Sequence, residues 1–170
     1  MQKTISLAVA CLLICGFART VGAADKLSAE DKDIIKDAMR NLQANGAACR
    51  LARDHSKNDR VQSLASQILG GDNKMIEQIH DLRKKYDLDF DTQPTNPDRK
   101  DRRALDKLEG SEFDREFVNT MVEQQEELLR IFKNGAKSEN SDVREWFDKK
   151  QEAIREHLDM AKRMQKDLKE

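Results

Sequence analysis

Four long segments of this chain repeat apolar residues with the period of an amphipathic α-helix, and this pattern constrains the fold most. The apolar stripes span residues 34–52, 61–82, 117–132 and 143–168. Each stripe follows the i, i+3, i+4, i+7 spacing of a helix that buries one face. Alternating strand patterns and short runs rich in Val and Ile are absent. The sequence therefore predicts an all-α fold.

One long connection divides these helical segments into two pairs. Residues 86–98 are polar, lack helical periodicity and contain the only two prolines, Pro94 and Pro97. A short helix is predicted around 99–108, ended by Gly110. Four long helices with one long connection in the middle favour a ferritin-like antiparallel four-helix bundle with one crossover connection.

Local signals place the helix ends. Ser28 precedes the first stripe and has Asp31 three residues later, as in a capping box. Ser111 is predicted to cap the third long helix in the same way. Gly70-Gly71 lies inside the second helix, where glycine costs about 1 kcal/mol relative to Ala. The pair indicates a kink or a close approach of another helix.

The first 23 residues are typical of a bacterial secretory signal. Lys3 gives the segment a positively charged n-region, and residues 5–17 form its apolar core. The small residues Val21-Gly22-Ala23 precede a cleavage site ahead of Ala24. The apolar run is too short for a stable membrane span. We expect a periplasmic or secreted protein with residues 24–170 as a single domain.

Charge and cysteine content exclude several classes of protein. Loss of Lys3 and Arg19 with the signal leaves 29 basic and 32 acidic residues, interleaved along the helices. Nucleic-acid binding requires a basic stripe, so the chain is not predicted to bind nucleic acid. Cys49 is then the only cysteine, which excludes an intramolecular disulfide and favours a small buried side chain over a reactive or intermolecular thiol.

Each of the four stripes carries one polar residue near its centre. These residues are Asn45, Asp72, Gln125 and His157. Burying a polar group without a partner costs on the order of 1–3 kcal/mol, so four such residues are expected to meet in one layer and satisfy one another. Metal sites of helical bundles are built in such positions.

Three interpretations of this set remain open. It is a structural hydrogen-bonded cluster, a divalent-metal site, or a partly solvated cleft for a small ligand. In a metal site the ligands are Asp72 and His157, with Asn45, Cys49 and Gln125 as further donors. Carboxamides are weak ligands, which favours the structural cluster without a cofactor. The spacing of Glu77 and His80 resembles that of di-iron bundles, but one such motif is too few, and both are expected on the surface.

The chain also resembles a known family. The motifs that carry the resemblance are Leu108-Glu109-Gly110-Ser111-Glu112-Phe113-Asp114, Met121-Val122 and Glu156-His157-Leu158. Together with residues 56–65 they resemble the exported bacterial family called domain of unknown function 4142. The resemblance covers about residues 30 to 165 and implies a ferritin-like four-helix fold without an established molecular function.

This resemblance also bears on the polar set. The family typically has an acidic residue, an Asp-His pair and a further histidine where this chain has Asn45, Gly71-Asp72 and Gln125. Only the last-helix histidine, His157, is kept. The resemblance implies that ligand strength is reduced in this member.

From these observations we expect an exported bundle protein without catalytic activity, with a binding or envelope-stress role. The first alternative is a divalent-metal or copper-binding protein that uses the polar set. The second is a module that presents a charged helix face to another envelope protein. An oxidase of the ferritin-like type is disfavoured because paired carboxylates are missing from the stripes.

Overall fold

The computed structural model describes residues 26–91 and 102–169, and nearly all of them are helical. The four long helices are α1 (Ala29–His55), α2 (Asp59–Lys85), α4 (Gly110–Gly135) and α5 (Ser141–Asp167). A short helix covers 102–105. The predicted connection falls partly in residues 92–101, which lie outside the described residues.

Side-chain caps begin three of the four long helices. The Ser28 hydroxyl accepts the backbone N–H of Asp31, and the Asp31 carboxylate accepts the backbone N–H of Ser28, which confirms the capping box of α1. The Asn58 side chain caps α2, and Asn140 caps α5. These contacts satisfy N–H groups that have no partner within the helix.

The predicted cap at Ser111 is wrong. Helix α4 already begins at Gly110, and its N-cap Glu109 makes no side-chain hydrogen bond. Gly110 has a φ of +56°, which a residue without a Cβ atom adopts at little steric cost. The backbone turn at Gly110 therefore starts the helix, in place of a hydroxyl cap.

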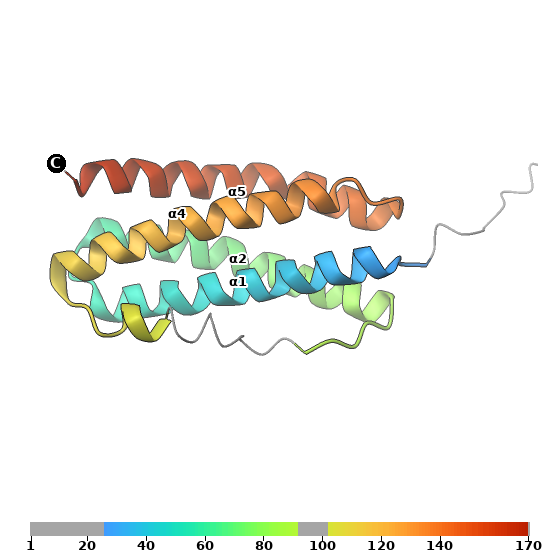
Figure 1. Cartoon of the computed structure of the whole chain (residues 1–170), viewed down its shortest axis with the longest axis horizontal. Helices are drawn as coiled ribbons and strands as arrows, with labels where there is room; N and C mark the ends of the chain where they lie inside the picture. Colours follow the sequence, from blue (N-terminus) through green and yellow to red (C-terminus); the bar gives the residue numbers. More distant parts are fainter. Residues whose placement is uncertain (1–25, 92–101, 170) are drawn as a thin grey trace, which may run out of the picture.

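The helices form an antiparallel four-helix bundle with a crossover, as predicted. Helix α1 packs against α2 and α4, and α5 packs mainly against α4 and more loosely against α2. Figure 1 shows that α2 ends at one end of the bundle and α4 begins at the other. Helices α2 and α4 therefore both start at the same end of the bundle, and these two diagonal helices run parallel (Figure 1).

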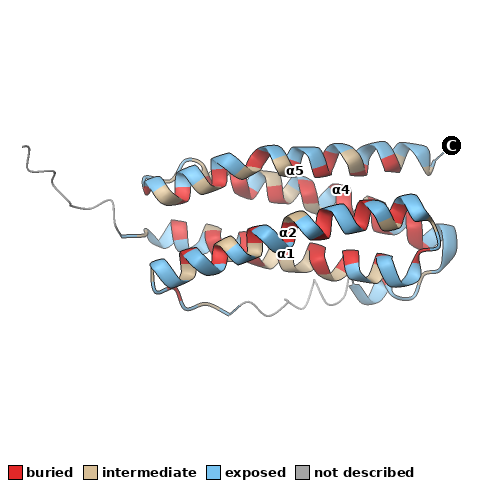
Figure 2. Cartoon of the chain, turned by 180° about the vertical axis from the view of Figure 1, so that it is seen from behind, coloured by how far each residue is buried: buried red, intermediate tan, exposed pale blue. Residues whose placement is uncertain are grey.

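Buried residues follow the inward face of every helix (Figure 2). They form two apolar clusters, one towards each end of the bundle. The first cluster includes Ala52, Ile68, Phe117 and Ala161, and the second includes Leu42, Ile79, Phe132 and Ile154. No helix in the described part of the chain is both long and apolar enough to cross a membrane.

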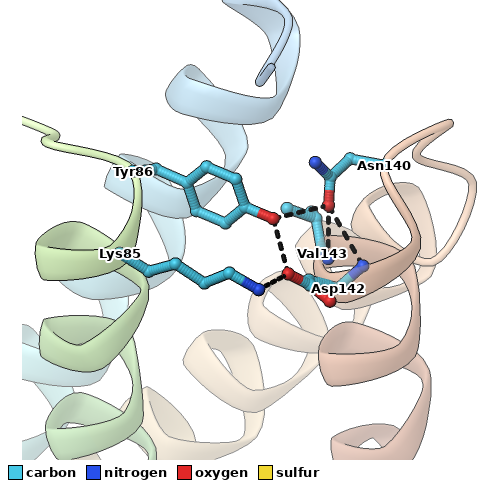
Figure 3. Close-up of polar contacts among 5 residues, drawn as sticks. All are labelled: Lys85, Tyr86, Asn140, Asp142 and Val143. Atoms are coloured by element: carbon cyan, nitrogen blue, oxygen red, sulfur yellow. Dashed lines mark hydrogen bonds and ion pairs between the residues drawn. The ribbon is translucent and has the colours of Figure 1, made fainter. Parts of the chain in front are cut away.

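A hydrogen-bonded contact joins the end of α2 to the start of α5 (Figure 3). The Tyr86 hydroxyl donates to Asp142 Oδ2 at 2.6 Å and lies 3.2 Å from Asn140 Oδ1. The same Asn140 oxygen accepts the backbone N–H groups of Asp142 and Val143. The exposed Lys85 ammonium pairs with Asp142. Tyr86 thus links the α2 end to the cap of α5.

Removing the Tyr86 hydroxyl should weaken this end of the bundle. Tyr86→Phe is expected to lower the free energy of unfolding by about 1–2 kcal/mol, because a hydrogen bond to a carboxylate is lost. Lys85→Ala is the matched comparison and should cost less than about 1 kcal/mol, since exposed ion pairs contribute little. Urea unfolding of the three proteins measures both values. A larger loss for Lys85→Ala would contradict this assignment.

Candidate functional site

The four polar residues of the stripes lie in one layer across the middle of the bundle. Asn45, Asp72 and Gln125 are fully buried, and the His157 side chain is 10% exposed. Along each helix, the residues on one side of the layer belong to one apolar cluster and those on the other side to the second. The predicted common layer is confirmed, and it divides the hydrophobic core in two.

Within this layer the side chains do not satisfy one another. His157 Nδ1 lies 4.0 Å from Asp72 Oδ1, too far for a hydrogen bond. Among the described residues, no hydrogen-bond partner reaches either carboxylate oxygen of Asp72, His157 Nδ1, or any side-chain N or O atom of Asn45 and Gln125. The expectation of a self-satisfied hydrogen-bonded cluster is therefore not met by this geometry.

Burial shifts the ionisation of both titratable groups. It raises the pKa of the Asp72 carboxyl to about 7. The neighbouring Asn45 carboxamide lowers this pKa in part, although no well-formed hydrogen bond joins the two side chains. Burial also lowers the pKa of His157, because the protonated ring is disfavoured away from water. The layer thus favours neutral forms of both residues.

Cys49 lies next to the layer, but its thiol is directed at Met121. Its thiol is fully buried and donates to Met121 Sδ, with 3.7 Å between the sulfur atoms. Burial and the nearby Asp72 charge both raise the pKa of the Cys49 thiol. Metal coordination needs the thiolate, so this geometry supports the buried, inert interpretation of Cys49.

The ring of His157 packs closely against the α2 backbone at Gly71. A Cβ atom on Gly71 would lie 2.5 Å from His157 Cε1 and 2.9 Å from Nε2. The imidazole therefore lies directly against the α2 backbone, and only glycine leaves room for it. Of the two explanations for Gly70-Gly71, the close approach is the one the structure supports, since α2 continues through both residues.

A surface groove runs between α2 and α5 over this contact. It is open to solvent and has a volume of about 650 Å³. His157, Gly70 and Gly71 lie in its lining. The other lining residues are mostly polar or charged: Ser66, Gln67, Lys74, Glu156, Asp159, Met160 and Arg163. Helical periodicity could not identify this groove, because its residues come from the exposed flanks of two helices; the glycine pair was the one available signal.

The donor set limits the chemistry of the site. No three side chains of His, Cys, Asp and Glu come close enough to hold a metal in the described part of the chain. The layer offers one carboxylate, one imidazole and two carboxamides. Glu77 and His80 are exposed, as expected for surface residues. These groups can donate and accept hydrogen bonds.

The adjacent glycines provide a matched test of the close approach. Gly71→Ala should destabilise the protein by about 1–3 kcal/mol, because the new methyl group displaces a buried ring. Gly70→Ala should stabilise it by up to about 1 kcal/mol, since its Cβ position has no atom within 4 Å and alanine favours the helix. Thermal and urea unfolding measure both changes. Equal effects of the two substitutions would refute the contact.

The raised pKa of Asp72 predicts a pH-dependent effect of Asp72→Asn. Asp72 titrates near 3.8 when unfolded and near 7 when folded, so the folded wild type loses stability as the pH rises between these values. An asparagine at this position does not titrate, so it adds no pH dependence to the stability. As the pH rises from 4 to 8, the free energy of unfolding of Asp72→Asn should therefore increase relative to that of the wild type by on the order of 3 kcal/mol. Urea unfolding at both pH values measures the gain, and a constant difference would contradict it.

Comparison with known proteins identifies the family but not a role. A crystal structure of a DUF305 fragment from Deinococcus radiodurans superposes with a TM-score of 0.73, covering 84% of this chain and 97% of that one. At 12% identity, this similarity concerns the fold alone. No curated protein sequence matched. The model of a domain of unknown function, DUF4142, matches residues 17–164, and the chain therefore belongs to the DUF4142 family.

Proposed function

We propose that this chain is an exported, non-catalytic binding protein whose ligand reaches the central polar layer through the α2–α5 groove. One observation carries the proposal: His157 borders the groove and also lies in the buried layer, beside an Asp72 carboxyl that has no hydrogen-bond partner. A ligand in the groove contacts His157, the residue of the layer that lines it.

The energetics of the layer support a binding role. An unpartnered buried polar group costs on the order of 1–3 kcal/mol, and the layer contains several. A bound polar molecule or ion that partners these groups recovers part of that cost. Binding then stabilises the folded protein in proportion to the ligand concentration.

The arrangement gives less support to catalysis. General acid–base or nucleophilic catalysis needs two reactive groups within reach of one substrate. The Cys49 thiol is directed to Met121 inside the core, and the layer has a single carboxylate. Oxidase chemistry of the ferritin-like type relies on several carboxylates around two metal ions.

Export is tested by fractionation of a bacterial culture that expresses the full chain. We expect the mature protein in the periplasmic or secreted fraction, with Ala24 as its first residue. Leu12→Arg is the control, because a charge within the apolar core of a signal should retain the uncleaved chain in the cytoplasm. A wild-type chain that starts at Met1 and stays in the cytoplasm would contradict export.

Binding is tested by native mass spectrometry of mature protein purified from the producing cells. The wild type should carry a small molecule or ion that His157→Ala has lost. His80→Ala, which changes an exposed histidine of α2, should retain it. A wild type that has the mass of the bare chain in repeated preparations would argue against the proposal.

A further inference from the structure

The α2–α5 groove continues past the polar layer towards the start of α2 and the end of α5. A second hollow adjoins it and shares Gln67, Met160 and Arg163 with it. Leu64, Met160 and Met164 give this second part an apolar floor. The combined hollow, which we call the long groove, is lined by residues between 59 and 74 of α2 and between 156 and 167 of α5.

The charges on the α5 rim of the long groove follow an ordered pattern. Four exposed residues line it there, two acidic and then two basic: Glu156, Asp159, Arg163 and Lys166. Their spacings of three, four and three residues place them along one face of the helix. The pattern is symmetric about Ala161. An antiparallel copy of the same helix therefore sets every acidic side chain opposite a basic one.

The α2 rim has the same symmetry. The exposed Asp59 and Lys74 line the long groove near its two ends, and their midpoint falls beside Gln67. Gln67 lines both hollows together with Met160 and Arg163, so the midpoints of the two rims lie at one level of the bundle. One twofold axis across the groove at this level, at right angles to the helices, therefore brings Asp59 opposite Lys74 of a second copy.

These six rim charges have no partner within the described part of the chain. None of their side chains makes a hydrogen bond or an ion pair with another described residue. Other charges on the exposed faces of α5 are paired internally, Arg155 with Glu152 and Lys162 with Glu126. The unpaired charges of α5 that line the long groove are thus available to a partner of complementary charge.

We propose that the long groove is the interface of a homodimer, in which a second copy of this chain docks antiparallel about this twofold axis. Such an interface is isologous, because each copy presents the same surface to the other. The apolar floor contributes contact area, and methionine side chains adapt readily to an opposing surface.

The rim charges select one register of the two copies. The twofold axis sets Glu156 opposite Lys166 and Asp159 opposite Arg163 of the other copy. A shift by two helical turns would instead place Glu156 opposite Asp159, and like charges in contact oppose association. This inference goes beyond the proposed function. A ligand in contact with His157 would then lie between the two copies.

Sedimentation equilibrium of the mature protein over a range of concentrations tests the dimer. The wild type should dimerise, and Arg163→Glu should raise the dissociation constant at least about 10-fold, because it places two acidic groups together twice per dimer. Lys133→Glu is the matched control. It makes the same change of charge on an exposed residue of α4 outside the groove, so its dissociation constant should stay within about twofold of the wild type.

A charge exchange tests the register. Asp159→Arg alone should dissociate the dimer as Arg163→Glu does, because it places Asp159→Arg opposite the native Arg163. An equimolar mixture of the two variants should form a mixed dimer, since every rim contact then joins opposite charges. Circular dichroism checks that both variants are folded.

Three results would overturn the dimer: a monomeric wild type, equal dissociation by Lys133→Glu, or two variants that stay monomeric when mixed. A different protein that copurifies on the groove of a monomeric wild type would also overturn it. A monomeric wild type that still carries a ligand dependent on His157 would refute the dimer and leave the proposed function intact.

Discussion

The structure depends on burying one polar layer inside an otherwise apolar core. Each apolar side chain that becomes buried contributes about 1.5–3 kcal/mol, and the two clusters contain enough of them to offset the cost of unpaired polar groups. The layer also separates the two apolar clusters along all four long helices.

Helices α2 and α5 meet at the polar layer through Gly71 and His157. An imidazole is bulky and partly polar, and His157 fits only because Gly71 has no side chain at the point of contact. Beside this contact a polar groove separates the two helices, whereas ion pairs of Lys85 with Asp142 and of Arg60 with Asp167 join them at the two ends. His157 is thus the one residue of the layer that also lines the groove.

Much of the fold could be predicted because helical periodicity reports burial directly. The stripes around Leu42, Ile79, Phe117 and Ile154 identified the inward faces of four helices, and the prolines located the crossover connection. The start of α4 was misplaced because a hydroxyl cap and a left-handed glycine are alternative ways to begin a helix. Sequence does not decide between a cap at Ser111 and a turn at Gly110.

The candidate site, like the fold, could be predicted only in part. The sequence by itself determined that Asn45, Asp72, Gln125 and His157 share one buried layer, because their positions along each stripe fix which way they point. Only the tertiary structure decided that these groups are left unpaired and that His157 reaches a groove over Gly71. Hydrogen bonds depend on distances of a few tenths of an ångström between helices, and a one-dimensional pattern carries no information about such distances.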